Sequence, residues 1–144
     1  IRNLNSEKYG FIIIGSGNHK PNFSNYKNVY DFENLYERHI KNDLYSISDL
    51  YLQPGWVGLS VVEAMAYGKP VLTFKRSQNT YQCVEYSYLK HGYNALIFDN
   101  INQALEIINS LSYMEIKEMS INAKDYIRKN LLMENMISNA YETL

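Results

Sequence analysis

The amino-acid sequence predicts an α/β protein whose mostly parallel sheet is covered by helices on both faces. Short runs rich in β-branched residues, such as 11–14 and 71–74, alternate with longer stretches in which apolar residues recur at helical spacing. This alternation is typical of parallel strands joined by helical crossovers. Gly68 precedes a proline and a strand-forming run, which is the pattern of a helix end that leads into a strand.

Length and composition bound the class of protein. A chain of 144 residues is expected to form a single domain, 1–144, that buries about two-thirds of its unfolded surface. Its formal net charge of -1, from 14 basic and 15 acidic residues, argues against a general attraction to nucleic acid. The single cysteine, Cys83, excludes an internal disulfide and fits a reducing cytoplasm, and we interpret it as a small packing residue. No apolar run approaches the ~20 residues of a transmembrane segment.

The first third of the chain predicts strands and one helix. Phe11 to Ile14 indicate a buried parallel strand, which ends at the glycine pair Gly15 and Gly17, a weak phosphate-loop signal by itself. Residues 28–32 and 49–52 predict two further strands. Between them Asn34 is a candidate N-cap for a helix. The apolar stripe of that helix consists of Tyr36, Ile40, Leu44 and Ile47.

The stretch 53–74 carries the clearest local signals. Gly55 and Gly58 indicate a tight loop, and a short helix follows that Gly68 ends. A proline then forbids more helix, and residues 71–74 predict a strand. The order is therefore strand, loop, helix, strand.

The short helix presents two kinds of surface. Leu59, Val62 and Ala66 recur at helical spacing, so we expect them to face a sheet, while Glu63 lies off that stripe. Helical side chains lean toward the N-terminus, which brings the Glu63 carboxylate back toward the loop. The first amides of a helix have no intrahelical partner. Here these amides belong to Gly58, Leu59 and Ser60.

This combination of amides and a carboxylate suits a ribose joined to a diphosphate. Phosphates bind well at the positive end of a helix, and an acidic residue accepts hydrogen bonds from ribose hydroxyls in other nucleotide-binding folds. A second interpretation is that Glu63 is an ordinary surface residue and that the glycines form an ordinary tight loop. The spacing alone fits both interpretations.

The remainder of the chain continues the α/β pattern. The polar loop 75–80 follows a predicted strand, where open α/β sheets bind ligands, so Lys75 or Arg76 is a candidate phosphate or sugar contact. We favour a solvated loop over this contact. Residues 85–98 repeat the order helix, glycine, strand. Asn100 and Gln103 form a candidate capping box, and amphipathic helices are predicted over 101–111, 116–127 and 133–144, with their apolar side chains in the core.

Several of these residues together resemble a family signature. The runs are Pro54-Gly55, Gly58-Leu59, Glu63-Ala64-Met65-Ala66 and Gly68-Lys69-Pro70-Val71. They resemble the signature of the family 4 (group 1) retaining glycosyltransferases, which are sugar-nucleotide enzymes with the two-domain GT-B fold. The resemblance spans nearly the whole chain. It implies that residues 1–144 form the Rossmann-like C-terminal, donor-binding half of a GT-B enzyme and that the chain begins after the first elements of that domain.

The resemblance implies roles for individual residues. Glu63 corresponds to the family's second glutamate, which binds the donor ribose, and the amides of Gly58 and Leu59 would hold the diphosphate. The family's first glutamate, which contacts the donor sugar, falls on Gly55, which has no carboxylate. Donor-sugar recognition in this protein would therefore differ or use another side chain.

The resemblance extends to the first strands. The family carries a similar strand and glycine pair near the donor, and the end of its next strand approaches the nucleobase, where Phe32 stands here. No catalytic residue and no metal ligand is expected within this half. The expected donor-binding residues are thus Glu63, Gly58, Leu59, Ser60, Gly15, Gly17 and Phe32.

The implied activity is transfer of a hexose from a nucleoside diphosphate sugar to a polysaccharide or glycolipid acceptor, with retention of anomeric configuration. Alone, this half is expected to bind a nucleotide weakly and to catalyse nothing. Two alternatives stay open: a non-catalytic accessory or regulatory GT-B domain, which Gly55 motivates, and a sugar-nucleotide epimerase. A dinucleotide-dependent dehydrogenase is disfavoured, because no Gly-x-Gly-x-x-Gly turn opens a βαβ unit.

The expected partners follow from the same resemblance. They are a nucleotide sugar and the N-terminal domain of the same enzyme, with no cofactor, no metal, no nucleic acid and no transmembrane segment. We expect a cytoplasmic location, and any peripheral contact with the inner membrane face would be made through the N-terminal domain.

Overall fold

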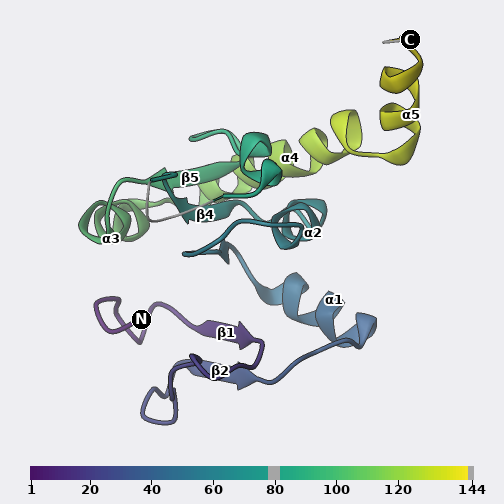
Figure 1. Cartoon of the computed structure of the whole chain (residues 1–144). Coiled ribbons are helices and arrows are strands. Elements are labelled where there is room, and N and C mark those ends of the chain that lie inside the picture. The colour runs from purple at the N-terminus through teal and green to yellow at the C-terminus, as the bar shows by residue number, and fades with distance from the viewer. Residues whose placement is uncertain (78–81, 143–144) are drawn as a thin grey trace. The chain divides into compact units, whose positions relative to one another are not determined.

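The computed structural model describes residues 1–77 and 82–142. It divides the chain into two compact units, Ile1–Ile47 and Ser48–Leu144, which are called unit 1 and unit 2 below (Figure 1). Each unit is described by itself. The predicted α/β class is confirmed, since both units contain parallel strands followed by helices.

Unit 1 contains a two-stranded parallel sheet and one helix. β1 (Phe11–Ile14) pairs in parallel with β2 (Val29–Phe32), and α1 (Arg38–Ile47) follows. The strand predictions are confirmed, but the prediction that β1 is buried is wrong. Its residues are half-buried or exposed, and no residue of unit 1 falls in the buried class. Two short strands and one helix offer too little apolar surface to enclose a core.

The start of α1 differs from the prediction. The helix begins at Arg38, and its first backbone bond runs from the Lys41 amide to the Glu37 carbonyl oxygen at 3.1 Å. Asn34 is therefore not the N-cap, and Tyr36 lies outside the helix and is exposed. Of the other residues of the predicted stripe, Ile40 and Leu44 are half-buried and Ile47 is exposed.

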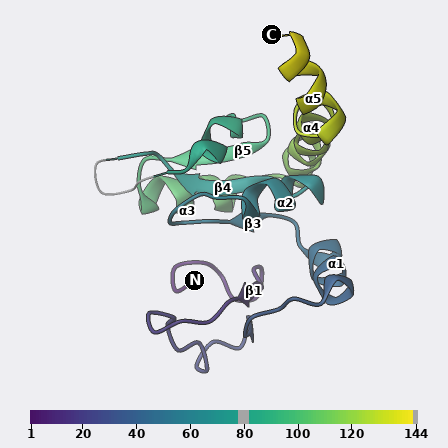
Figure 2. The ribbon, with the colours of Figure 1, turned by 45° about the vertical axis from the view of Figure 1, so that its right-hand side comes forward.

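Unit 2 is built on a three-stranded parallel sheet of order β3-β4-β5 (Figures 1 and 2). Its strands are β3 (Tyr51–Leu52), β4 (Val71–Phe74) and β5 (Ala95–Phe98). The connection from β3 to β4 passes through α2 (Ser60–Ala66), so the predicted strand, loop, helix, strand order is confirmed. The single predicted sheet is present as two ladders, one in each unit.

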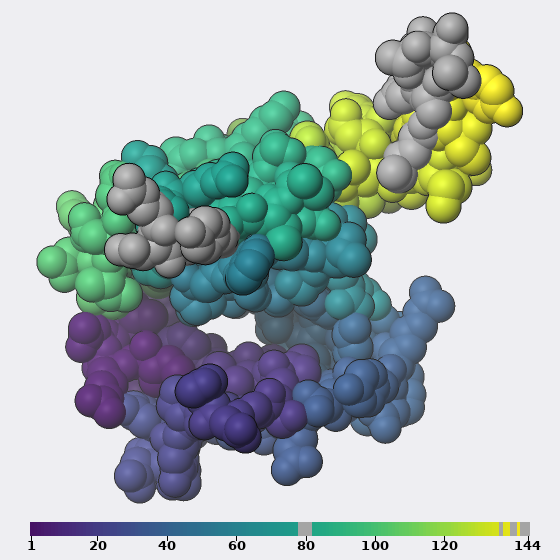
Figure 3. Space-filling model, viewed as in Figure 1, coloured from purple at the N-terminus to yellow at the C-terminus, as the bar shows by residue number. Residues whose placement is uncertain are grey.

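The core of unit 2 lies on both faces of this sheet. Successive strand residues enter different hydrophobic clusters, as the period of two in a strand requires. The first cluster joins the sheet to the loop before α2, to α2 and to α4 (Tyr113–Asn130); its buried residues are Val57, Val61, Met65, Val71, Leu89, Ala95, Ala123 and Ile127. The second joins the sheet to α3 (Ile101–Ser110) and α4; its buried residues are Leu72, Leu96, Phe98, Ala104 and Met119. In the space-filling view these teal and green segments form one closely packed body (Figure 3).

The inward face of α2 differs from the predicted stripe. The buried residues are Val61, Ala64 and Met65, whereas Leu59 is 75% exposed and Ala66 is exposed. Val57 is fully buried just before the helix, and it extends the Val61 stripe by one turn. Both stripes are apolar and both fit helical spacing, so the packing of Val57 against the sheet decides between them.

Gly68 ends α2 as predicted. Its φ of 72° lies in the left-handed region, its amide donates to Met65 at 2.9 Å, and the Lys69 amide donates to Ala64 at 2.9 Å. These two bonds are those of a Schellman C-cap. The Lys69 ammonium then donates to the Ser48 carbonyl oxygen at 2.6 Å, and burial lowers the pKa of Lys69 below its ordinary value.

The segment before β5 is not the predicted α-helix. Val84–Tyr88 form a short 3-10 helix, η1, and Gly92 turns the chain with a φ of 75°. The buried Asn94 side chain closes this turn, because its Oδ1 accepts from the Lys90 amide at 2.7 Å and its Nδ2 donates to Tyr88 at 3.0 Å. These side-chain bonds replace the i→i−4 ladder of a longer helix.

Side-chain caps define the starts of α3 and α4. Asn100 accepts from the Gln103 amide at 3.0 Å, as predicted, but Gln103 Oε1 accepts from Asp99 rather than from Asn100, so the capping box is only half confirmed. A complete capping box opens α4, where Ser112 and Glu115 bond each other reciprocally.

α5 (Met133–Glu142) lies beyond the C-terminal end of α4 (Figures 1 and 2). The prediction that its apolar side chains enter the core is wrong for Met133, Ile137 and Tyr141, which are exposed. Leu144 and the side chains of Met136 and Ala140 lie outside the described part of the chain. Helical spacing predicts α5 but does not tell whether a neighbouring element covers its apolar face.

Candidate functional site

The loop between β3 and α2 is held by one buried residue between exposed neighbours. Val57 is fully buried, whereas Trp56 is 63% exposed and Leu59 is exposed. The first turn of α2 then starts on the carbonyl oxygens of Gly58 and Leu59, which accept from Val61 at 3.1 Å and from Val62 at 3.0 Å. The apolar core thus anchors the loop and leaves the start of α2 at the surface.

The amides at this helix start have no acceptor in the described structure. Those of Gly58, Leu59 and Ser60 donate no hydrogen bond to any atom of residues 1–77 or 82–142. The N-cap residue, Leu59, has no side-chain acceptor to offer them. Three adjacent donors are therefore available to a ligand. Glu63 is half-buried in the same first turn of α2.

The two glycines of this loop are not required by the local backbone. Neither Gly55 nor Gly58 has a positive φ, and a Cβ atom added at either would meet no atom within 4 Å. The chain itself would thus accept a side chain at both positions. The space next to Gly58 borders the amides that have no acceptor among the described residues, so a glycine there leaves room for a ligand to approach the backbone.

A distant segment holds the loop in place. Gln82 Oε1 accepts from the Val57 amide at 2.7 Å, and the Cys83 amide donates to the Val57 carbonyl oxygen at 3.2 Å. Trp56 Nε1 donates to Cys83 Sγ at 2.9 Å. Cys83 is exposed, so the prediction of a packing residue is wrong. Residues so far apart in the sequence give no local pattern from which these contacts follow.

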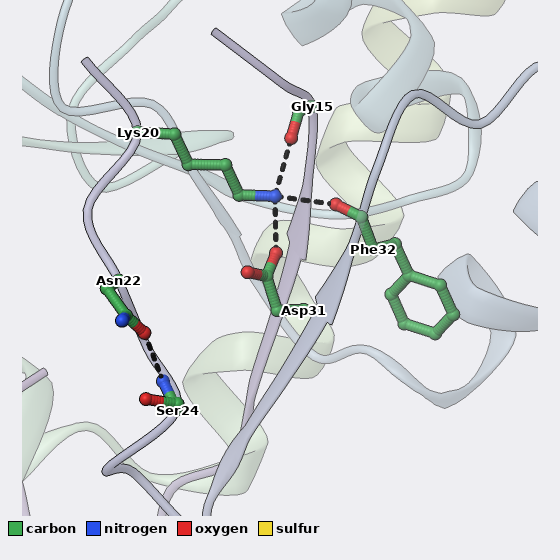
Figure 4. Close-up of polar contacts among 6 residues, drawn as sticks. All are labelled: Gly15, Lys20, Asn22, Ser24, Asp31 and Phe32. Carbon is green, nitrogen blue, oxygen red and sulfur yellow. Dashed lines mark hydrogen bonds and ion pairs between the residues drawn. The ribbon is translucent and has the colours of Figure 1, made fainter. Parts of the chain in front are cut away.

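In unit 1 a lysine connects the ends of the two strands (Figure 4). Gly15 and Gly17 have φ angles of 130° and 152°, and they open the loop after β1. The Lys20 ammonium donates to the carbonyl oxygens of Gly15 at 2.6 Å and Phe32 at 2.8 Å, and it forms an ion pair with Asp31. Two predicted site residues, Gly15 and Phe32, are therefore linked through Lys20.

The role of Lys20 follows from its donor count. An ammonium has three N–H groups, and Gly15, Phe32 and Asp31 supply three acceptors. No donor of Lys20 is then left for a phosphate. Lys20 is a structural residue that holds the loop after β1, and sequence analysis missed it because a lysine in a polar loop carries no distinguishing pattern.

The first residues of the basic loop after β4 are exposed, as a solvated loop predicts. Lys75 forms an ion pair with Asp99 at 2.6 Å, and its amide donates to Phe98 at 2.9 Å. The hydrogen bond and charge of Asp99 raise the pKa of Lys75 above its ordinary value. Lys75 therefore joins the ends of β4 and β5, while Arg76 is exposed. Residues 78–80 of the predicted loop lie outside the described part.

The predicted donor-binding residues fall into two sets. Gly58, Leu59, Ser60 and Glu63 lie together at the start of α2 in unit 2, and Gly15, Gly17 and Phe32 lie at the strand ends of unit 1. Within the described residues, no group of three or more His, Cys, Asp and Glu side chains could hold a metal ion. Across the same residues, every helix is too short or too polar to span a membrane.

Comparisons with known proteins relate this chain to one family. The family described as Glycosyl transferases group 1 matches residues 2–141. No curated protein matches the chain. Among solved structures, the chain is similar to TarM, with 19% identity and a TM-score of 0.69. It is also similar to a glycosyltransferase from Rickettsia africae ESF-5, with 18% identity and a TM-score of 0.66, and to HepE from Anabaena in complex with UDP-glucose, with 18% identity and a TM-score of 0.62.

These solved structures are longer than the chain. The matches cover 92%, 95% and 94% of this chain but only 28%, 40% and 41% of theirs. At such identities the likeness shows the fold, which is that of the C-terminal portion of GT-B glycosyltransferases. With a family match that runs over nearly the whole sequence, this protein belongs to the group 1 glycosyltransferases.

Proposed function

We propose that this chain is the nucleotide-sugar-binding half of a retaining glycosyltransferase that moves a hexose from a nucleoside diphosphate sugar to a polysaccharide or glycolipid acceptor. The amides of Gly58, Leu59 and Ser60 bind the diphosphate, and the Glu63 carboxylate accepts from the ribose hydroxyls. For Gly15, Gly17 and Phe32 of unit 1, contact with the donor stays a prediction of the family resemblance. The acceptor is bound by a further domain of the same enzyme.

The observation that carries this proposal is the set of adjacent amides at the start of α2 that have no acceptor among residues 1–77 and 82–142, in a chain that belongs to a glycosyltransferase family. A hydrogen bond to a charged group contributes about 1.5–3 kcal/mol net. Two or three such bonds correspond to dissociation constants from roughly millimolar to micromolar. Weak binding of a nucleotide by this half alone is therefore expected.

The same amides would assist catalysis in the whole enzyme. Negative charge grows on the diphosphate as the sugar departs, and fixed N–H donors stabilise that charge without reorganising. Glu63 would hold the ribose and so orient the sugar carbon toward the acceptor. The complex of HepE from Anabaena with UDP-glucose supports a nucleoside diphosphate hexose as the ligand class and makes UDP the first probe.

The proposal is tested by comparing Gly58→Ala with Gly55→Ala. Both variants are expected to fold like the parent chain, because neither added Cβ meets an atom within 4 Å and neither position has a positive φ. Titration calorimetry with UDP, and in parallel with GDP and ADP, measures the affinity. We expect Gly58→Ala to weaken binding about tenfold or more, which is ~1.4 kcal/mol, and Gly55→Ala to leave it within about twofold. Equal affinity of all three chains would refute a diphosphate at Gly58.

One alternative is favoured by a specific residue. Gly55 supplies no carboxylate where the resemblance places a sugar-contacting glutamate, as in an accessory domain without activity. Glu63→Ala in the full-length enzyme decides between the two functions: unchanged sugar transfer would refute the catalytic one. The exposed free thiol of Cys83 supports a cytoplasmic location, which stays a prediction.

A further inference from the structure

We propose that Gln82 and Cys83 form a strut that holds the loop 55–58 in the conformation that receives the nucleotide, and that Gln82 is a positioning residue for this site. The strut is the pair of residues 82–83 together with its bonds to the loop. The effect on affinity rests on the proposed function, whereas the effect on the loop does not.

The strut occupies both backbone polar groups of one loop residue. The Val57 amide donates to Gln82 Oε1 at 2.7 Å, and the Val57 carbonyl oxygen accepts from the Cys83 amide at 3.2 Å. The Val57 side chain is fully buried at the same time. Val57 is thus fixed by packing on one side and by hydrogen bonds on the other. Without Gln82 the buried Val57 amide would lose its acceptor. An unsatisfied buried donor costs more free energy than the loss of a solvent-exposed hydrogen bond.

Gln82 also ties the loop to the sheet. Its side chain is nearly enclosed, with 8% of the residue exposed. Its Nε2 lies 3.5 Å from the carbonyl oxygens of Gly55 and of Phe74, the last residue of β4. One buried amide group therefore meets the loop at two residues and the carboxyl end of the central strand at a third. Gln82 therefore fixes the position of the loop 55–58 relative to β4.

The third link concerns the residue before Val57. Trp56 Nε1 donates to Cys83 Sγ at 2.9 Å, while most of the indole is exposed. Gly58 and Leu59 follow Val57 directly, so the directions of their N–H groups depend on the dihedral angles that the strut fixes at Val57. Preorganised donors bind better than donors that must first be ordered. Loss of the strut should therefore weaken nucleotide binding without removing any group that contacts the nucleotide.

A matched pair of buried amides provides the test. Gln82→Leu removes the acceptor of the Val57 amide, and Gln82→Glu keeps an acceptor there. Asn94→Leu is the control, because Asn94 is also buried and also accepts a backbone amide at 2.7 Å, but from Lys90. Hydrogen exchange of the Val57 amide and emission of the single tryptophan, Trp56, report on the loop without a ligand. Calorimetry with UDP reports on the site.

The expected pattern separates positioning from general stability. In Gln82→Leu the Val57 amide should exchange faster and the UDP dissociation constant should rise, each on the order of tenfold. In Asn94→Leu both should stay within about twofold of the parent chain, although the chain is destabilised. Gln82→Glu should keep slow exchange at Val57 and most of the affinity, because a buried glutamate beside the carbonyl oxygens of Gly55 and Phe74 takes up a proton and then keeps both an acceptor and a donor. If Gln82→Leu does not fold, Gln82→Glu decides: weak UDP binding with slow Val57 exchange would overturn the proposal.

The remaining outcomes are also decisive. Unchanged UDP affinity in Gln82→Leu, with fast exchange at Val57, would show that binding does not depend on the strut. Equal losses of affinity in Gln82→Leu and Asn94→Leu would show a general stability effect instead. If the parent chain binds none of UDP, GDP and ADP, the proposed function fails, and the strut is then judged by exchange alone: slow Val57 exchange in Gln82→Leu would overturn it.

Discussion

A Cβ atom on Gly68 would lie 2.5 Å from Cε of Lys124, because α2 ends against α4. Gly68 also has a φ of 72°. An alanine at this position would therefore be destabilised both by the close contact and by the left-handed backbone conformation. Gly92 provides the control, since its φ is 75° but nothing lies within 4 Å of its added Cβ.

We predict that Gly92→Ala lowers the free energy of unfolding by about 1 kcal/mol, the cost of the left-handed conformation. Gly68→Ala should cost about 1–2 kcal/mol, because the Lys124 side chain must also move aside. Urea denaturation measures both values. In a Lys124→Ala background the cost of Gly68→Ala should fall toward that of Gly92→Ala, with Ser120 Oγ at 3.0 Å as the remaining close contact. An unchanged cost would exclude a steric contribution of Lys124.

Thr73 carries a buried hydroxyl without a partner. The residue is fully buried in β4, and its Oγ1 has no hydrogen-bond partner in the described part of the chain. Thr73→Val replaces that hydroxyl by a methyl group of similar size, so we expect it to raise the free energy of unfolding by about 1 kcal/mol. Thr73→Ser keeps the hydroxyl and should destabilise. A destabilising Thr73→Val would mean that Oγ1 is satisfied by a water molecule or ligand.

Lys20 is predicted to stabilise unit 1 rather than to bind the ligand. The Lys20 side chain is 21% exposed. Lys20→Met removes the donors to the carbonyl oxygens of Gly15 and Phe32 and the ion-pair partner of Asp31. It should lower the free energy of unfolding by about 1–3 kcal/mol, while Lys27→Met at an exposed position should stay within about 0.5 kcal/mol. Addition of UDP should leave the ammonium signal of Lys20 unchanged in NMR spectra of the parent chain. A large shift of this signal would show instead that the Lys20 ammonium binds the phosphates of UDP.

The stability of the start of α4 depends on pH through the ionisation of Glu115. The hydroxyl and then the amide of Ser112 donate to its carboxylate and hold the pKa of Glu115 below its ordinary value. A carboxyl whose folded pKa is lowered stabilises the folded state above its unfolded pKa of about 4.3 and loses that contribution as the pH falls through the folded pKa. Side-chain NMR titration should show the lowered pKa in the parent chain and a higher pKa in Ser112→Ala, where only the backbone amide of residue 112 still donates. An identical pKa in both chains would contradict the capping box.

Local signals predict much of this fold because they depend on neighbouring residues alone. The strands β1 and β4 have the predicted bounds, and Gly68 ends α2 through bonds that a glycine makes possible. Burial needs information from distant elements. The choice between the Leu59 and Val61 stripes of α2 depends on Val57 entering the core, and the exposure of Tyr141 in α5 depends on the absence of a covering element among the described residues.

The candidate site shows the same division. The amides of Gly58, Leu59 and Ser60 have no acceptor in the part of the chain that the structure describes, as a helix start preceded by glycines predicts. The residues that support the site, Gln82 and Lys20, were not predicted, because each acts across a sequence separation that no local spacing reveals. A long-range side-chain bond follows from the fold, and only after the fold is known.

A titration of the isotope-labelled chain with UDP, GDP and ADP, followed through the backbone amide shifts, tests the proposed donor site itself. We expect one of these nucleotides to shift the amides of Gly58, Leu59, Ser60 and Glu63 together, with the largest changes at the residues that hold the diphosphate. Glu63→Gln should weaken the same titration when the ribose is present and leave binding of inorganic diphosphate unchanged. If none of the three nucleotides shifts these amides at millimolar concentration, the start of α2 does not bind a nucleoside diphosphate.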